Sequence, residues 1–280
     1  MYFSAKEILA QLEGTDKRIC DLAIQNETEL FETPYDKIME MLEERYQIMY
    51  NSAHDALEKE IRSLSGLTGG SARKMWDYYK KGSMICDGTI IRGAAYALSC
   101  LEVNASMGLI VAAPTAGACG ILPGCLLTVA EKHDIPHQQV LEALATASGI
   151  GQLIVKKATV SGAEGGCQAE CGSAAAMAAG AVVEMLGGTP AQAFDAAAIA
   201  AFTIGLAGTA FLGGAVFAYL NGLLPLMVVL AVPGFLGWIA PYFCYQKIQR
   251  RRAEQTAPII EQKNDEIYSV CEQGCRLLTA

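Results

Sequence analysis

The segment with the clearest chemical potential reads Ser161-Gly-Ala-Glu-Gly-Gly-Cys-Gln-Ala-Glu-Cys171-Gly. Its glycines permit backbone conformations that other residues avoid, which predicts a tight loop. Cys167 and Cys171 are four residues apart, so both thiols would share one face if the chain is helical there. One interpretation is a thiolate ligand for a metal or cluster, and the other is a pair of small buried side chains. The C-x-x-x-C spacing matches no standard zinc motif.

A second group of polar residues lies in an apolar neighbourhood rich in glycine and proline, between residues 102 and 124. Asn104, Ser106 and Thr115 each need a hydrogen-bond partner if they are buried. This favours a substrate site, although a crossing point between packed helices would have the same composition. The glycine-rich loop 65–71 precedes a helix that Ser71 would cap, and its free N–H groups suit an anion or carboxylate. It lacks the P-loop pattern, and many such loops only connect helices.

The elements that position these residues are predicted to be helices. Ser4 and Glu7 form a capping-box pattern, and Thr33-Pro34 reads as an N-cap followed by a first-turn proline. Apolar residues then recur at helical spacing. The predicted helices cover residues 4–13, 34–64, 87–101, 138–158 and 173–186, with another after Thr189-Pro190. Strand signals are few, so we predict an all-α fold with loops at 65–71, 113–124 and 161–167.

Composition excludes some functions. The chain has 280 residues, 18% charged, and a net charge of −8, whereas soluble domains average about 25% charged residues. Residues 247–252 form the only basic cluster, which argues against nucleic acid as a partner. Residues 1–20 carry six charges and no long apolar core, so no signal peptide is predicted and the ten cysteines are expected to be cytoplasmic thiols.

Four motifs together resemble one enzyme family. They are Gly66-Leu-Thr-Gly-Gly, Asn104-Ala-Ser-Met-Gly, Ala113-Pro-Thr-Ala-Gly-Ala-Cys-Gly-Ile-Leu-Pro-Gly and the Ser161 segment. In this order they resemble the alpha subunit of iron–sulfur-dependent L-serine dehydratases, which are L-serine ammonia-lyases. The resemblance runs from residue 1 to about residue 200.

The resemblance implies a [4Fe–4S] cluster that acts as a Lewis acid on the serine hydroxyl, a base that removes the α-proton, and pyruvate and ammonia as products. It implies L-serine as substrate and a serine dehydratase beta subunit as partner. The family pattern makes Cys167 one cluster ligand and places Asn104, Ser106 and Thr115 as catalytic residues. It implies that five further residues bind substrate: Thr68, Gly69, Gly70, Ala116 and Gly117.

The chain departs from the family after about residue 200. The family's other two cluster cysteines belong to a Cys-Asp-Pro-Val segment that this chain lacks. Cys171 and Cys119 are possible substitutes. The hypothesis that follows is that this chain alone neither holds a stable cluster nor dehydrates serine.

The sequence that stands in place of the family's cysteine segment is apolar. Residues 196–246 contain no charged residue, and about 20 apolar residues suffice to span a bilayer. We predict a transmembrane hairpin with spans at 199–220 and 223–245, followed by the basic cluster at a cytoplasmic end. A buried helical pair in a soluble core is the alternative.

The predicted domains are therefore a helical catalytic-type domain at 1–200, the hairpin at 201–246 and a charged C-terminal helix at 247–280. Three functions remain open from the sequence. The first is a dehydratase alpha subunit. The second is a non-catalytic, membrane-anchored relative that binds a beta subunit. The third is an integral-membrane protein with a soluble appendage, and detergent dependence and iron content distinguish among the three.

Overall fold

Helices account for every regular element that the structure, a computed structural model, describes in residues 4–82 and 86–203. An isolated bridge between Arg62 and Gly69 is the sole β-type pairing in these ranges, so the all-α prediction is confirmed there. Residues 190–203 are also helical. The named helices are α1 (Ala5–Leu12), α2 (Ile19–Phe31), α3 (Tyr35–Glu58), α4 (Ser71–Lys80), α5 (Gly88–Ala105), η1 (Ala116–Ala118), α6 (Ile121–Lys132), α7 (His137–Lys157), α8 (Gly162–Gly165) and α9 (Cys167–Met185).

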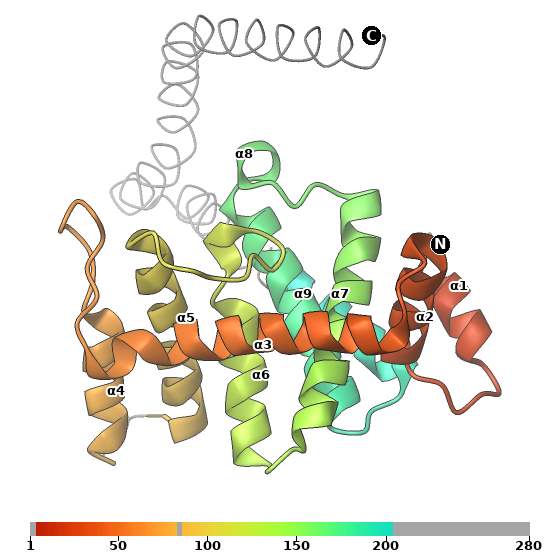
Figure 1. Cartoon of the computed structure of the whole chain (residues 1–280), viewed down its shortest axis with the longest axis horizontal. Coiled ribbons are helices and arrows are strands. Elements are labelled where there is room, and N and C mark those ends of the chain that lie inside the picture. Colours follow the sequence, from red (N-terminus) through yellow and green to blue (C-terminus); the bar gives the residue numbers. More distant parts are fainter. Residues whose placement is uncertain (1–3, 83–85, 204–280) are drawn as a thin grey trace, which may run out of the picture. The chain divides into compact units, whose positions relative to one another are not determined.

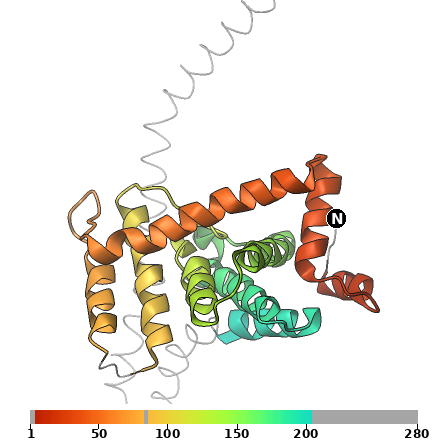
Figure 2. The same ribbon diagram turned by 60° about the horizontal axis from the view of Figure 1, so that its bottom comes forward.

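Six helices pack side by side as a row in the order α4, α5, α6, α9, α7 and α2. The long helix α3 crosses this row and contacts α5, α7 and α4 (Figures 1 and 2). The centre of the row is rich in alanine: Ala147 of α7 and Ala181 of α9 are fully buried. Small side chains let helix axes approach closely, and the alanine-rich sequence of α9 therefore serves the packing of α7 against α9.

A buried glutamate of α9 caps the start of α2. Glu184 accepts hydrogen bonds from the backbone N–H groups of Ile19 (2.8 Å) and Cys20 (3.1 Å), and from the hydroxyl of Thr146 on α7. A carboxylate is stabilised at a helix N-terminus by the free N–H groups and the helix dipole. Three helices are thus tied together at one buried group.

A second buried glutamate caps α4 in the same manner. Glu102 Oε1, near the end of α5, accepts from the N–H groups of Ser71 (2.6 Å) and Ala72 (3.1 Å). The other oxygen, Oε2, is buried and has no partner among the described residues. This contact fixes the glycine-rich loop before α4 against the C-terminal end of α5.

Local predictions differ from the structure at five points, and a tertiary contact accounts for the one at Ser71. The N-cap of α3 is Pro34 rather than Thr33, and α3 ends at Glu58 because Lys59 is extended. Gly70, at a positive φ of 79°, is the N-cap of α4 and Glu102 does the capping that Ser71 was predicted to do. The loop predicted at 113–124 ends earlier, since α6 begins at Ile121. The loop predicted at 161–167 includes the single turn α8, and α9 starts at Cys167.

Residues 204–280 lie outside the described ranges, and with them almost all of the predicted hairpin and the predicted C-terminal helix. Among the helices described for residues 4–82 and 86–203, none combines the length and the apolar character needed to cross a bilayer. The spans predicted at 199–220 and 223–245 therefore stay predictions.

Candidate functional site

Three loops that carry the sequence motifs lie along one edge of the helical row. They are residues 59–70, 106–120 and 158–166, and Figure 1 shows them at the upper ends of α5, α6, α7 and α9. The edge therefore gathers the glycine-rich loop before α4, the turn after α5, the segment around η1 and the start of α9. This is the arrangement that the predicted substrate site requires.

Thr115 and Asn104 meet at the turn η1. The side-chain amide of Asn104 donates to the carbonyl of Ala116 at 2.9 Å, which holds the Thr115–Gly117 turn against the end of α5. The hydroxyl of Thr115 is buried and lacks a partner within the described part of the chain. A buried hydroxyl without a partner is costly in a folded protein, so this atom suits a ligand that supplies the missing hydrogen bond.

Glu170, in the first turn of α9, is a residue that the sequence analysis did not single out. A Cβ atom on Gly117 would lie 2.9 Å from its Oε2, and one on Gly162 would lie 2.6 Å from the same oxygen. Both distances are shorter than real Cβ contacts, so a side chain at either position would require the Glu170 carboxylate to move from its present place. No described residue donates a hydrogen bond to Glu170. The signal in the sequence was an acid three residues after Cys167, flanked by glycine loops.

The two cysteines of α9 share one helix face, as their spacing predicted. Their sulfur atoms are 3.8 Å apart, and Cys167 is exposed whereas Cys171 is half-buried. Burial raises the pKa of the Cys171 thiol, and its hydrogen bond to Cys167 and the charge of Glu170 raise it further. At neutral pH Cys171 is therefore a protonated thiol in the absence of a metal.

Cys119 lies in a different environment. It is buried in a core cluster that α3, α4 and α5 also supply, and its thiol contacts the carbonyl of Cys100 at 3.9 Å. Burial raises the pKa of this thiol as well. Its role as a substitute ligand stays a prediction, and it would require Cys119 to turn out of this core.

The remaining predicted residues line the same edge but differ in how they are held. The hydroxyl of Ser106 donates to the carbonyl of Val103 at 2.8 Å, within the last turn of its own helix. Thr68 is exposed at the tip of its loop, and Gly69 and Gly70 follow it into α4. The N–H groups of Ser71 and Ala72 are occupied by Glu102, so an anion at this loop would have to use other donors.

The described residues do not fit a [4Fe–4S] cluster by themselves. In residues 4–82 and 86–203, no group of three or more histidine, cysteine, aspartate or glutamate side chains is arranged to hold a metal ion. The cluster of the resembled family needs three thiolates, and this edge supplies the Cys167–Cys171 pair. A third thiolate would have to come from Cys119, if it turned out of its core, or from outside the described residues.

Comparison with known proteins identifies the family of this chain. The sequence profile described as "Serine dehydratase alpha chain" matches residues 14–206. The chain belongs to the serine dehydratase alpha chain family. The resemblance inferred from the four motifs is thereby confirmed up to about residue 200.

Several relatives of this family have sequences close to that of the chain. The L-serine dehydratase alpha chain of Peptoniphilus asaccharolyticus is 42% identical over 199 residues, which cover 71% of this chain and 68% of the relative. The probable L-serine dehydratase alpha chain of Bacillus subtilis (strain 168) is 39% identical, and 66% of it is covered. An L-serine dehydratase of Mycobacterium bovis is 37% identical over 211 residues, with 44% covered. The matched region therefore spans from under half to about two thirds of the length of each of these relatives.

Proposed function

We propose that this chain is the alpha-chain component of an L-serine ammonia-lyase and that the edge formed by the three loops binds L-serine. The observation that carries this proposal is the convergence of Asn104, Thr115 and Glu170 beside Cys167. The fold brings a polar group of each residue to the edge. Two of these groups, the Thr115 hydroxyl and the Glu170 carboxylate, have no hydrogen-bond partner among the described residues. L-Serine offers the complementary groups: an ammonium, a carboxylate and a hydroxyl.

In this proposal Glu170 accepts hydrogen bonds from the substrate ammonium, since its carboxylate reaches the edge with no donor from the described residues. The Thr115 hydroxyl donates to the substrate carboxylate, and Asn104 keeps the turn in place through its bond to Ala116. Loss of the α-proton and of the β-hydroxyl from the bound serine gives aminoacrylate, which hydrolyses to pyruvate and ammonia. Orientation by fixed groups of this kind lowers the barrier by reducing the entropy lost in reaching the reactive geometry.

We propose further that turnover depends on groups beyond the described residues. Departure of hydroxide needs an electrophile, and the Cys167–Cys171 pair is one thiolate short of the family's ligand set. We therefore keep the hypothesis that the chain alone neither retains a stable cluster nor dehydrates serine, and we route no step through a cluster.

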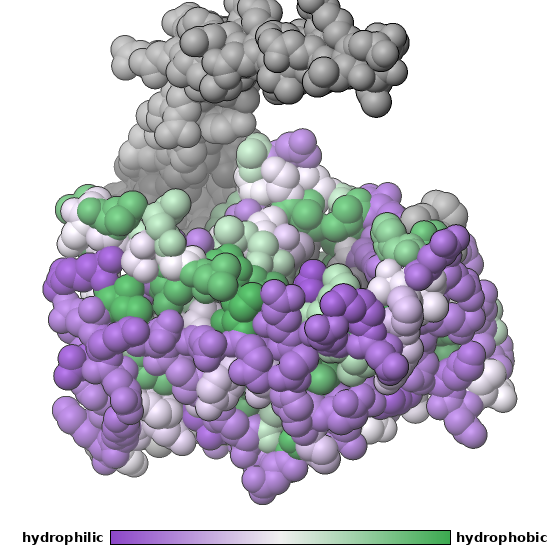
Figure 3. All heavy atoms as spheres, viewed as in Figure 1, coloured by the Kyte–Doolittle hydropathy of each residue, from purple (hydrophilic) through white to green (hydrophobic). Residues whose placement is uncertain are grey.

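A beta subunit is the partner that the family resemblance implies, and the same edge offers a surface for it. Four apolar side chains on its loops are highly exposed: Leu64 (80%), Leu67 (85%), Met107 (78%) and Leu109 (72%). Figure 3 shows apolar residues gathered along the upper part of this face. Exposed apolar patches mark interaction sites, and a partner that covers this edge would also exclude water from the substrate.

A second candidate is a non-catalytic, membrane-anchored relative. It rests on one observation, the absence of charge from residue 196 to residue 246. In that case the alpha-chain domain would be cytoplasmic, and the edge would bind a beta subunit without dehydrating L-serine. A related alternative is an integral-membrane protein to which the alpha-chain domain is a soluble appendage. Fractionation with and without detergent separates both from a soluble enzyme.

The test is anaerobic reconstitution of the full chain with iron and sulfide, with and without a beta subunit. The measurements are iron and sulfide content and pyruvate formed from L-serine. We expect well under four irons per chain without a beta subunit and no pyruvate. About four irons per chain together with pyruvate would contradict the cluster hypothesis and establish the chain as a complete catalytic subunit. If added beta subunit restores both, the alpha-chain proposal holds, whereas an inactive, iron-free complex favours the membrane-anchored relative.

A further inference from the structure

A cavity of about 590 Å³ lies between α2, α3 and α7, and residues 111–114 of one edge loop form part of its wall. Sites for small organic molecules are typically of this size. Its floor is apolar and well buried: Ile38 (8% exposed), Leu122 (2%) and Leu144 (6%) belong to it. None of the residues assigned to the serine site lines it, so it is a separate feature of the fold.

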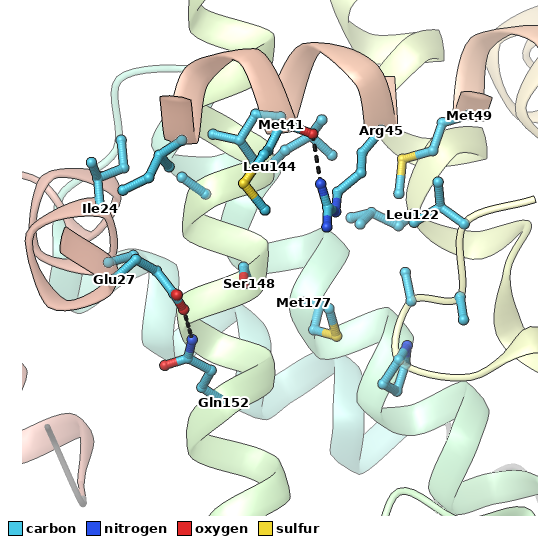
Figure 4. A pocket seen from close by; sticks show the side chains of 18 of the residues that line it. Ile24, Glu27, Met41, Arg45, Met49, Leu122, Leu144, Ser148, Gln152 and Met177 are labelled. Atoms are coloured by element: carbon cyan, nitrogen blue, oxygen red, sulfur yellow. Dashed lines mark hydrogen bonds between the residues drawn. The ribbon is translucent and has the colours of Figure 1, made fainter. Parts of the chain in front are cut away.

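Two charged side chains line the cavity, Arg45 and Glu27, and the apolar walls do not explain the presence of Arg45. Figure 4 shows Arg45 reaching from α3 into the cavity. Its guanidinium donates from Nη1 to the carbonyl of Met41 at 2.8 Å, and no described carboxylate lies within ion-pair distance. A guanidinium has five N–H donors, so most of its hydrogen-bonding capacity remains open toward the cavity.

The acidic group of the cavity is engaged elsewhere. Glu27 of α2 accepts from the side-chain amide of Gln152 on α7 at 2.5 Å, and Figure 4 shows the two side chains turned toward each other. Arg45 retains solvent exposure whereas the floor is buried. The positive charge therefore stands at the open side, with apolar surface beneath it.

From this arrangement we infer that the cavity binds an amphipathic monocarboxylate, with the carboxylate paired to Arg45 and an apolar tail on the floor. The planar guanidinium matches a carboxylate with two parallel hydrogen bonds. Methionines contribute to the walls, including Met49 and Met177, and their flexible side chains adapt to tails of different shape.

The position of the cavity connects such a ligand to the loop edge. Ala113 and Pro114 form part of its wall, and the next residue is Thr115, whose buried hydroxyl we assign to the proposed serine site. An occupant would restrict residues 111–114 and thereby the η1 turn. The binding claim itself is independent of whether the chain dehydrates serine.

Calorimetric titration of the full chain tests the inference. The probes are octanoate and 4-methyl-2-oxopentanoate, which represent fatty-acid and amino-acid-derived carboxylates, with octanamide as the neutral control. We expect at least one carboxylate to bind and octanamide to bind about tenfold more weakly or not at all, since a hydrogen bond to a charged group has about this value. The tighter carboxylate then identifies the source of the ligand.

Two variants and a matched control locate the site. Arg45→Met keeps the apolar stem and should weaken carboxylate binding about tenfold or more. Ser148→Trp fills the cavity from α7 and should abolish binding. Lys59→Met removes the same charge just after α3, where Lys59 pairs with exposed Asp55 (3.5 Å), and should leave binding unchanged.

Four results with the probes, with Arg45→Met or with the control variant would overturn the inference. These are no binding of either carboxylate at millimolar concentration, equal binding of octanamide, an unchanged affinity in Arg45→Met, or an equal loss in Lys59→Met. Circular dichroism of each variant confirms that it is folded. Binding that persists in Ser148→Trp would place the ligand elsewhere in the chain and also contradict the inference.

Discussion

Two buried glutamates cap helix N-termini in this protein, but only one of them is fully paired. Glu184 uses both oxygens, and its three donors come from α2 and α7. Glu102 uses Oε1 for two N–H groups of α4 and leaves Oε2 buried without a partner among the described residues. The first junction lies within the packed row, and the second adjoins the loop edge.

The same contrast holds for two threonines. The hydroxyl of Thr146 is bonded to Glu184 in the core, whereas the hydroxyl of Thr115 at the edge has no partner in the described part of the chain. Buried polar groups are usually paired in folded proteins, and Arg92 Nε and Thr128 Oγ1 lack partners among the described residues although they lie away from the edge. The two unpaired groups beside the edge are Glu102 Oε2 and Thr115 Oγ1. A ligand that completes them is the explanation we favour, and the difference between the junctions can be tested by substitution.

Glu184→Ala should produce the largest loss of stability. It leaves two buried N–H groups and the Thr146 hydroxyl without an acceptor, and each unpaired buried group costs about 1–3 kcal/mol. We expect the free energy of unfolding to fall by about 3 kcal/mol or more, measured by urea denaturation. Glu29→Ala, an exposed change on α2, is the control and should have little effect. If Glu184→Ala lowered the free energy of unfolding as little as the control does, the structural role of this cap would be refuted.

Glu102→Gln should cost much less stability, about 1 kcal/mol. The amide oxygen can still accept from Ser71 and Ala72, and the amide N–H₂ replaces an oxygen that has no described partner. Glu184→Gln offers the matched comparison. Both oxygens of Glu184 accept hydrogen bonds, so the amide N–H₂ would meet a donor and the loss should be larger. Equal losses in the two glutamine variants, measured by the same denaturation, would remove the distinction between the junctions.

Thr115→Val should leave stability within about 0.5 kcal/mol of the parent chain, since it replaces an unpaired hydroxyl with a methyl group of similar shape. L-Serine binding should nevertheless weaken about tenfold, the value of one hydrogen bond to a charged carboxylate. Thermal unfolding and calorimetry measure the two quantities. Thr146→Val is the opposite case, and there stability should fall because Glu184 loses a donor.

The smallest effect concerns thiol reactivity at the edge. Because burial raises the pKa of Cys171, less thiolate is present at neutral pH, and iodoacetamide should modify Cys171 more slowly than exposed Cys167. Raising the pH should increase the rate at Cys171 as its thiolate forms. Peptide mass spectrometry gives both rates, and a rate at Cys171 that does not increase between pH 7 and 9 would contradict this environment.

Local signals in the sequence predicted most of the helices. Ser4 caps α1 as its pattern indicated, accepting from the N–H of Glu7 at 3.3 Å. The helix predicted at 138–158 lies within one residue of α7, whereas α9 begins six residues before the predicted start at Ser173. The motif glycines predicted the loops. These features depend on residues close together in the chain, which is why the sequence reveals them.

The two glutamate caps and the cavity were not predictable in this way. Glu184 meets Ile19 across 165 residues and Glu102 meets Ser71 across 31, and neither pairing has a local signature. The same tertiary contact displaced the predicted Ser71 cap. Glu170 was visible in the motif, but its meaning depends on Gly117 and Gly162 lying against it. The cavity beside Arg45 combines residues of five helices, α2, α3, α6, α7 and α9, whose packing the sequence does not specify.

The central claim is that L-serine binds at the edge beside Cys167, and site-resolved protection tests it most directly. Cys167 and Cys86 are both exposed free cysteines, and only Cys167 belongs to the edge. Iodoacetamide modification of the full chain is followed at both residues, with L-serine, with D-serine and without ligand. We predict that L-serine slows modification of Cys167 several-fold, that D-serine does so less, and that Cys86 is unaffected. Equal rates at Cys167 with and without saturating L-serine would contradict the account.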